Sequence, residues 1–264
     1  MDTLGLGRIG IGIAATDSYL DDACELDTIG YPTLWLAGGQ IDRLGRLADL
    51  VDATENANIV PGIVPVDVFG PSETRKLYDD LGPSGRFVLG LGGPQTARPL
   101  AKLNAYLDEL ALPAHHLILA ALGPRKLEIA RDRAAGAVTL LVTADYTADA
   151  RKFLGDSVLV VDQFVVLETD PSRARGLARE PLSFLVTVPG YRNNLLRMGF
   201  TSEDVEQLSD RLVDAVVAWG SVDSISARVD EHLDAGADHV VLELLGTSAL
   251  DAGRAMAELV ATPK

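Results

Sequence analysis

Three short segments of this sequence combine small residues with a following helix start, a pattern that suits the binding of a phosphorylated cofactor. Small residues let a flat ring or a phosphate approach the backbone closely. The free N–H groups in the first turn of a helix attract anions, and Arg125 adds positive charge. Any one segment can be merely a tight turn, but three in succession also support a cofactor site. The segments are Gly90-Leu91-Gly92-Gly93-Pro94, Ala120-Ala121-Leu122-Gly123-Pro124-Arg125 and Val142-Thr143-Ala144.

Several carboxylates and one aromatic segment are weaker candidates for chemistry. A carboxylate at a strand end can act as a general base when burial raises its pKa, although most such residues cap helices or face solvent. The segment Tyr191-Arg192-Asn193-Asn194 suits either a grip on a polar substrate or the start of a helix. No catalytic acid can be assigned, and Asp67 and Tyr191 remain weak candidates. The acids considered are Asp42, Asp67, Asp145, Glu168 and Glu243.

Alternating strands and helices must position these residues. Eight short runs rich in Val, Ile and Leu alternate with segments whose apolar residues lie three and four positions apart. Runs that are apolar throughout indicate burial on both faces, and hence parallel pairing. Asp170-Pro171 marks a helix start and Gly236 a helix end. The runs cover residues 8–13, 33–36, 59–64, 86–91, 116–121, 137–142, 163–168 and 238–244.

These elements predict an α/β fold, a single (β/α)8 TIM barrel that forms one domain over residues 1–264. The seventh and eighth strands are about 70 residues apart, so an insertion is predicted between them, where it would overhang the top face. The alternative is an open doubly wound sheet. Closure is favoured because a sheet of eight such units would otherwise leave two edges unprotected.

The histidines stand where chemistry is not expected. His115 and His116 lie at the start of one predicted strand, His239 lies at the start of another, and His232 lies on a predicted helix. Strand starts form the face of a barrel that serves stability, whereas chemistry occurs at the strand ends. The sequence therefore predicts neither a histidine-ligated metal centre nor a serine–histidine pair.

Composition limits the partners of the chain. Lys and Arg number 23 and Asp and Glu number 38, giving a net charge of −15, which disfavours nucleic acid and anionic membranes. The single cysteine, Cys24, excludes a disulfide framework and fits a reducing compartment. No apolar run approaches the roughly 18 residues that span a bilayer. We therefore expect a soluble, cytoplasmic protein that acts on a small-molecule substrate.

Five segments, taken in order, resemble the luciferase-like monooxygenase family, in particular its branch dependent on the deazaflavin coenzyme F420. They span nearly the whole chain in the family's order, and the family's fold is a (β/α)8 barrel. The segments are Gly30-Tyr31-Pro32-Thr33-Leu34-Trp35-Leu36, Gly85-Arg86-Phe87-Val88-Leu89-Gly90-Leu91-Gly92, Ala120-Ala121-Leu122-Gly123-Pro124-Arg125, Leu167-Glu168-Thr169-Asp170-Pro171 and Asp234-Ala235-Gly236-Ala237-Asp238-His239-Val240.

The resemblance implies a flavin or deazaflavin over the strand ends, with its phosphate at the fifth and sixth strands, and a homodimer. It also implies a bulged non-prolyl cis peptide behind the ring, where the third strand ends. Carried over by position, the cofactor-binding residues are Ile63 and Val64 behind the ring, Gly92 and Gly93 beside the ribityl chain, Ala120, Ala121, Leu122 and Gly123 along the tail, and Val142 and Thr143 beside the phosphate, with Arg125 close by.

Two features depart from the family's pattern. Many deazaflavin-dependent members place a histidine after the second strand, but this chain has Ala37-Gly38-Gly39-Gln40 there, without a proton carrier. The chain is also short for the family, so a more open pocket is expected. The expected function is an F420-dependent oxidoreductase that transfers a hydride to or from a small organic substrate. The alternatives are an FMN-dependent monooxygenase of the same family and a cofactor-binding barrel without turnover.

Overall fold

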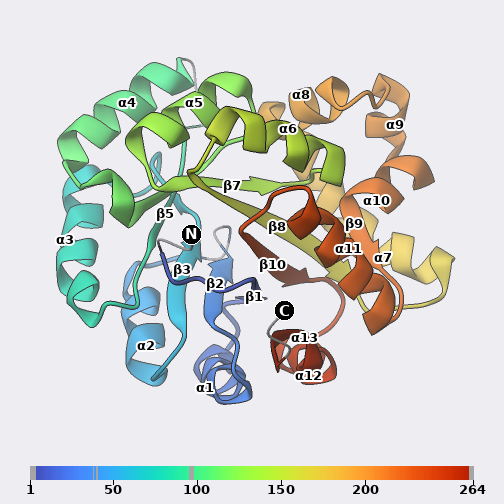
Figure 1. Cartoon of the computed structure of the whole chain (residues 1–264), viewed down its shortest axis with the longest axis horizontal. Helices are drawn as coiled ribbons and strands as arrows, with labels where there is room; N and C mark the ends of the chain where they lie inside the picture. The colour runs from blue at the N-terminus through green and yellow to red at the C-terminus, as the bar shows by residue number, and fades with distance from the viewer. Residues whose placement is uncertain (1–3, 38, 40, 95–97, 262–264) are drawn as a thin grey trace.

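The computed structural model describes residues 4–37, 39, 41–94 and 98–261, and its strands form one parallel sheet that closes into a barrel (Figure 1). Strands β3 and β4 are separated only by Ile63 and share one position in the ring, because β3 pairs with β2 and β4 pairs with β5. A bridge from Ile59 to Phe87 completes this junction. β9 pairs only with β8 and lies off the ring. The ring thus has the eight predicted strand positions. The strands are β1 (Ile9–Ile13), β2 (Thr33–Ala37), β3 (Asn58–Gly62), β4 (Val64–Pro65), β5 (Leu89–Gly92), β6 (Leu117–Ala120), β7 (Gly136–Leu140), β8 (Val158–Val166), β9 (Val217–Trp219) and β10 (His239–Leu244).

Each of the eight predicted runs overlaps a strand of the ring, but the region around β8 differs from the prediction. β8 begins at Val158, whereas the sequence analysis begins this strand at residue 163. The polar residues Asp162 and Gln163 interrupt an apolar stretch, and its first half was therefore not predicted. The short strand β9 is absent from the eight runs, because its residues directly continue the apolar pattern of the helix over Asp210–Val216.

Helices cover the outside of the barrel (Figure 1). The predicted start signal at Asp170-Pro171 is confirmed, since the Asp170 side chain accepts a hydrogen bond of 2.8 Å from the backbone N–H of Arg173. In the described part of the chain, no helix is both long and apolar enough to cross a membrane. The helices are α1 (Tyr19–Ile29), α2 (Gly45–Ala53), α3 (Pro71–Leu81), α4 (Pro99–Leu110), α5 (Pro124–Arg133), α6 (Ala144–Leu154), α7 (Pro171–Leu185), α8 (Pro189–Arg197), α9 (Ser202–Gln207), α10 (Asp210–Val216), α11 (Val222–Asp234), α12 (Ala249–Ala255) and α13 (Glu258–Ala261), with short 3₁₀ turns at Gly82–Ser84 and Ala114–His116.

The interior of the barrel changes in character from bottom to top. Its lower part is a packed cluster that includes the buried side chains of Trp35, Val60 and Val160. Because side chains alternate along a strand, the inward positions nearer the strand ends fall on small residues such as Gly92 and Ala120. The barrel is therefore closed by its own core below and opens toward the strand ends, where barrel enzymes bind ligands.

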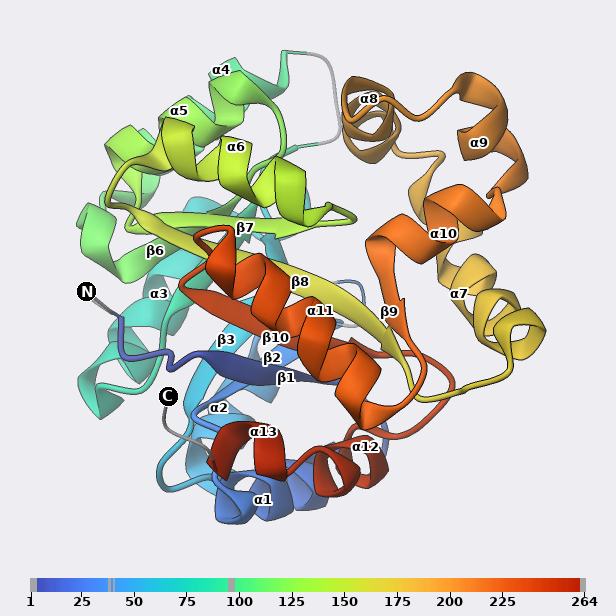
Figure 2. The ribbon, with the colours of Figure 1, turned by 45° about the vertical axis from the view of Figure 1, so that its right-hand side comes forward.

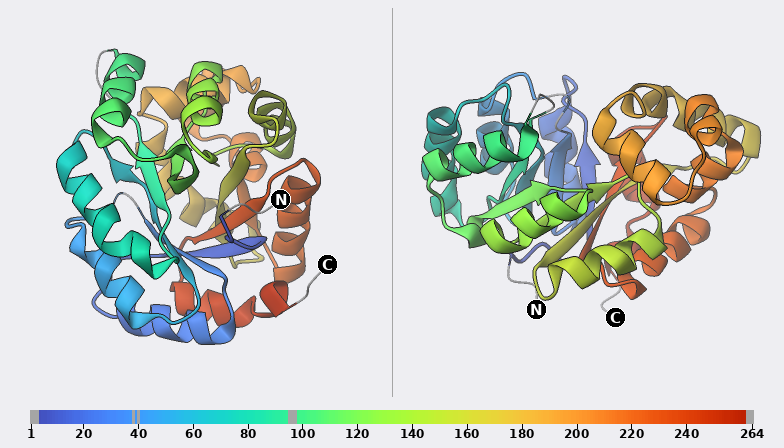
Figure 3. Two further views of the ribbon diagram at one scale, coloured as in Figure 1. Left: turned by 60° about the vertical axis from the view of Figure 1, so that its left-hand side comes forward. Right: turned by 90° about the horizontal axis from the view of Figure 1, so that it is seen from above.

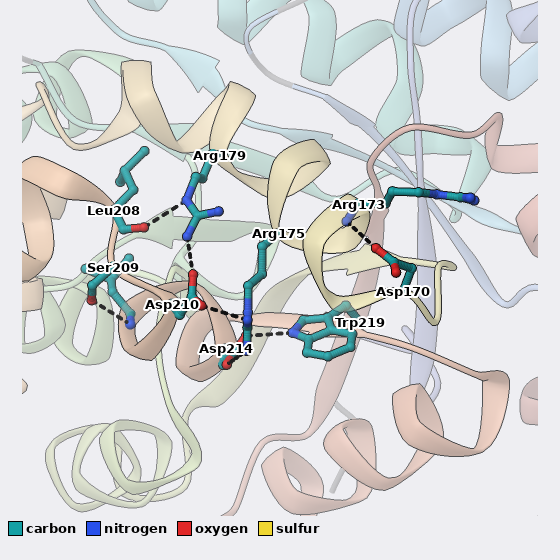
Figure 4. Close-up of polar contacts among 10 residues, drawn as sticks. Asp170, Arg173, Arg175, Arg179, Leu208, Ser209, Asp210, Asp214 and Trp219 are labelled. Carbon is teal, nitrogen blue, oxygen red and sulfur yellow. Dashed lines mark hydrogen bonds and ion pairs between the residues drawn. The ribbon is translucent and has the colours of Figure 1, made fainter.

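The predicted insertion between the seventh and eighth barrel strands is formed by α7 to α10 and β9. It has its own apolar cluster, which packs against the far end of β8, and it stands to one side of the barrel (Figures 2 and 3). Arg175 fixes α7 to α10 through ion pairs of 2.7 Å with Asp210 and Asp214, and Trp219 of β9 donates to Asp214 (Figure 4). The network therefore joins α7, α10 and β9 of the insertion to one another.

Candidate active site

A cavity of about 180 Å³, which we call the mouth cavity, lies at the carboxyl ends of the strands from β3 to β8. Both weak catalytic candidates, Asp67 and Tyr191, line it. Tyr191 comes from α8, so the insertion contributes one wall. Six of the predicted cofactor-binding residues also line this cavity: Ile63, Gly92, Gly93, Ala120, Ala121 and Leu122.

The Ile63 side chain occupies the space over Gly92. A Cβ atom at Gly92 would lie 2.0 Å from Ile63 Cδ1, so only glycine fits beneath this side chain. A ligand in the mouth cavity would therefore meet the Ile63 side chain, not a bare backbone at Gly92. The strand is interrupted at Ile63, as the resemblance implies, but no peptide bond among the described residues is cis. The expected cis bond is thus wrong for this segment.

A second cavity, of about 480 Å³, lies between α5 and α6 on one side and α8 and α10 on the other. We call it the side cavity. It adjoins the mouth cavity, since Leu122 lines both. Thr143, predicted to flank a phosphate, lies in its wall and caps α6 by accepting from the backbone N–H of Tyr146. The Tyr146 hydroxyl donates to the Leu122 carbonyl at 2.5 Å.

The side cavity has several groups that suit an anion. Arg197 and Arg211 line it, and Arg197 donates to Asn194 Oδ1 at 3.0 Å. Asn194 is 1% exposed, and its Nδ2 has no hydrogen-bond partner among the described residues. A buried donor without a partner costs about 1–3 kcal/mol, and an anion placed there would satisfy it. Asp145 and Asp149 also line this cavity and reduce its positive potential.

The other predicted cofactor residues lie elsewhere. Gly123 and Arg125 line a shallow cavity of about 400 Å³ together with Lys126 and Arg197. It adjoins the mouth cavity and the side cavity, because Lys126 also lines the former and Arg197 the latter. Val64 and Val142 are buried in the core cluster, so their side chains do not enter these cavities.

Two carboxylates stand on neighbouring strands at the top of the barrel interior. Asp162 of β8 lines the mouth cavity, and its Oδ1 is buried without a hydrogen-bond partner among the described residues. Burial raises the pKa of Asp162 to about 7. Glu243 of β10 lies beside it, and burial together with the charge of Asp162 raises the pKa of Glu243 well above its usual range. These carboxyl groups can therefore exchange protons near neutral pH.

Two further side chains of the mouth cavity have shifted ionisation. Burial, with a smaller contribution from the charge of Asp162, raises the pKa of Tyr191 to about 12. Burial lowers the pKa of Lys126, whose Nζ would lie 3.2 Å from a Cβ at Gly93. Tyr191 is thus a neutral hydrogen-bonding group at ordinary pH, and Lys126 points toward the same space from the first turn of α5.

Most other candidate acids have structural roles. Glu168 accepts from the backbone N–H of Asp170 and pairs with Arg173, and Asp42 pairs with Arg46. The histidines also serve the framework. His232 bonds to Thr147 and Gln163, and the Trp35 indole donates to His239 at 3.0 Å. Glu243 instead lies on the strand next to that of Asp162, an acid that the sequence analysis does not single out.

Sequence reasoning missed Asp162, Lys126 and Arg197. The sequence did contain a signal for Asp162, since it is a lone charge within an apolar run of strand length. Burying such a charge costs free energy unless it is paired, which makes it a candidate for a functional role. The sequence contains no such signal for Arg197, because its position beside α5 depends on how the insertion packs. The segment after β2 includes Gly38 and Gln40, which lie outside the described residues, so the structure describes it only at Ala37 and Gly39.

Comparison with known proteins shows the fold. No family model and no curated protein matches the sequence. Among solved structures, an F420-dependent secondary alcohol dehydrogenase in complex with an F420–acetone adduct superposes with a TM-score of 0.77 at 10% identity, covering 97% of this chain and 99% of that one. The coenzyme F420-dependent tetrahydromethanopterin reductase from Methanopyrus kandleri gives a TM-score of 0.72 at 16% identity, covering 97% of both chains.

A flavin protein shares the fold as well. The oxygenating constituent of 3,6-diketocamphane monooxygenase from Pseudomonas putida, in complex with FMN, gives a TM-score of 0.64 at 13% identity over 98% of this chain and all of that one. The fold is therefore the TIM-barrel-like α/β fold found in F420-dependent oxidoreductases and in FMN-dependent monooxygenases.

Proposed function

We propose that this chain is an F420-dependent oxidoreductase of the luciferase-like monooxygenase family, which transfers a hydride between the deazaflavin and a small organic substrate. The observation that carries the proposal is the adjacency of two unlike cavities, one small and largely apolar in its walls and the other containing two arginines, which meet at Leu122. A flat ring with an anionic tail needs both environments side by side. The fold shared with F420-dependent enzymes supports this choice.

The residues present fit such a cofactor. The orphaned Nδ2 of Asn194 and the guanidinium of Arg197 would hold a phosphate group, beside the first turns of α5 and α6. Ile63 and Ala120 would support the ring in the mouth cavity. The bound deazaflavin would supply the hydride chemistry, while the protein orients the ring and substrate and excludes water.

The insertion would cover the reacting groups. Tyr191 of α8 lines the mouth cavity, and its buried hydroxyl can donate a hydrogen bond to a substrate oxygen. α8 also supplies Asn194 and Arg197 to the side cavity. One helix would therefore contact both ends of the cofactor, so that binding of the tail fixes the wall around the ring.

The alternative is an FMN-dependent monooxygenase of the same family, which the shared fold of the FMN-bound monooxygenase favours. A barrel that binds cofactor without turnover is the third candidate, motivated by the absence of a histidine after β2. Parallel titrations with F420 and FMN, followed by assay with a test enone, separate the three.

The direct test is cofactor binding by purified protein, followed by cofactor fluorescence. We expect F420 to bind more tightly than FMN. Arg197→Ala should weaken binding about tenfold, because a hydrogen bond to a charged group contributes about 1.5–3 kcal/mol. Arg254→Ala, at an exposed arginine paired with Glu25 on α1, is the matched control and should bind as the parent does. The proposal fails when neither cofactor binds or when both variants bind alike.

A further inference from the structure

We propose that Asp162 and Glu243 form an acid–base pair beside the mouth cavity, in which Glu243 keeps a proton and Asp162 exchanges another proton with the substrate. The inference rests on the proposed function and deepens it, because every hydride transfer to or from a neutral organic molecule is accompanied by a proton. The segment after β2 carries no histidine to supply that proton, whereas β8 and β10 carry two carboxyl groups on neighbouring strands.

The register of the sheet places both side chains on the inner face of the barrel. β8 and β10 are parallel neighbours in which Asp162 aligns with Val241, and Glu243 with Phe164. Val241 belongs to the interior cluster. Because side chains alternate along a strand, Glu243 points inward as Val241 does, one layer higher, and Asp162 is its diagonal neighbour on the adjoining strand.

A glycine on the next strand makes room for Glu243. A Cβ at Gly12 of β1 would lie 2.1 Å from Glu243 Oε2, so the carboxyl group packs directly on the β1 backbone. Asp162 lies on the other side of β10 from Gly12 and lines the mouth cavity, while its Oδ1 is buried without a hydrogen-bond partner among the described residues. Glu243 is thus packed against the barrel wall, whereas Asp162 borders the space where a substrate would lie.

Electrostatics then keep a proton on the pair. The two carboxyl groups lie on neighbouring strands and their charges interact, so both cannot ionise at moderate cost, and one retains its proton while the other titrates. Burial raises the pKa of both groups, and the charge of Asp162 raises that of Glu243 further. Glu243 is therefore the holder of the proton near neutral pH, and Asp162 is the exchanging member.

Other charged or titratable groups face this space from several elements. Lys126 from α5, Tyr191 from α8 and Asp67 after β4 line the same cavity. His239, lower on the inner face of β10, bonds to the Trp35 indole and the Gly7 carbonyl. Lys126 and Asp162 thus line one cavity, and burial disfavours the charged form of each.

The proton balance is simple for an alcohol. The O–H bond would break and its proton would move to the ionised carboxylate of Asp162. The adjacent C–H bond would break with its electron pair leaving as hydride, for which the bound deazaflavin would be the acceptor, and a C=O bond would form. In the reverse direction, protonated Asp162 returns the proton to the carbonyl oxygen as hydride arrives at carbon. Asp162 ends one proton richer or poorer, and Glu243 retains its own proton throughout.

The test has two readouts, neither of which needs a known substrate. Carboxyl carbons of Asp and Glu, labelled with carbon-13, are followed by NMR from pH 5 to 9 in the parent, Asp162→Asn, Glu243→Gln and the control Asp156→Asn, an exposed turn residue before β8. We expect two carbons of the parent to titrate above pH 6. Glu243→Gln should remove the upper step, and Asp162→Asn should remove the lower step and move the upper one downward. The control should change neither.

The second readout is the absorbance of F420, and of FMN in parallel, bound to saturation in the same variants. Its pH titration should follow the lower carboxyl step and vanish in Asp162→Asn. Titration of both carboxyl groups in their ordinary range overturns the interaction between them, and raised titration without a cofactor response overturns the catalytic role. Binding of neither cofactor, measured separately by fluorescence, refutes the proposed function and with it the catalytic role, while the carbon titration still decides whether the two carboxyl groups interact.

Discussion

The two halves of the barrel mouth differ sharply. On the side of β3 to β6 the strand ends present small or apolar groups such as Ile63, Gly92 and Ala120, and the charged residues of this side come from the segments after the strands. On the side of β8 and β10 Asp162 lines the mouth cavity and Glu243 lies on the next strand, where Gly12 of β1 leaves room for the Glu243 side chain. One half fits a flat ring by shape, and the other offers a proton. Because different residues form the two sides, substitutions should be able to disrupt cofactor binding and proton transfer separately.

Filling the side of the mouth cavity formed by β3 to β6 should have the largest effect on cofactor binding. In Ala120→Trp the indole would occupy much of the mouth cavity, and F420 binding should weaken by at least about a hundredfold, or about 2.8 kcal/mol. The matched control is Ala105→Trp on the exposed face of α4, which should bind normally. Fluorescence titration measures both, and circular dichroism confirms the fold. Equal binding by the two variants would place the cofactor outside the mouth cavity.

Crowding the Glu243 side chain should lower the free energy of unfolding. Gly12→Ala places a methyl group 2.1 Å from Glu243 Oε2 and forces that side chain to move, with a loss of about 1–3 kcal/mol in the free energy of unfolding. The loss should shrink when Glu243 is itself replaced by alanine. Gly176→Ala, at a helix position with open space around it, should be neutral or slightly stabilising. Denaturant titration checks the series, and an undiminished loss in the double variant would rule out the contact.

Asp162 and Glu243 should also make the free energy of unfolding depend on pH. Because the folded-state pKa values of Asp162 and Glu243 are raised, the folded protein binds more protons than the unfolded chain above the ordinary carboxyl pKa. The free energy of unfolding therefore falls as pH rises from about 4 to the raised folded-state pKa, which is about 7 for Asp162, by at most about 1.4 kcal/mol per pH unit per proton. Glu243→Gln should flatten this slope, and Asp156→Asn should keep it. Equal slopes for both variants would mean that folding does not raise the pKa of Glu243.

The sequence and the structure agree most closely where local chemistry decides. The eight strands were predictable because buried parallel strands have few polar residues, and six cofactor candidates at their ends converge because strand ends of a barrel meet at one face. Asp162 was missed because it splits its strand, so the charge was taken as a boundary. Arg197 and Asn194 come from the insertion, whose packing against α5 and α6 depends on contacts distant in sequence.

The central claim is that a ring in the mouth cavity joins a phosphate in the side cavity. The most direct measurement is the electron density of F420 in crystals of the protein grown with it. The account predicts ring density against Ile63 and Ala120, with Asp162 at its open side and the phosphate at Arg197 and Asn194. Density for the ring outside the mouth cavity, or for a phosphate distant from Arg197, would contradict it.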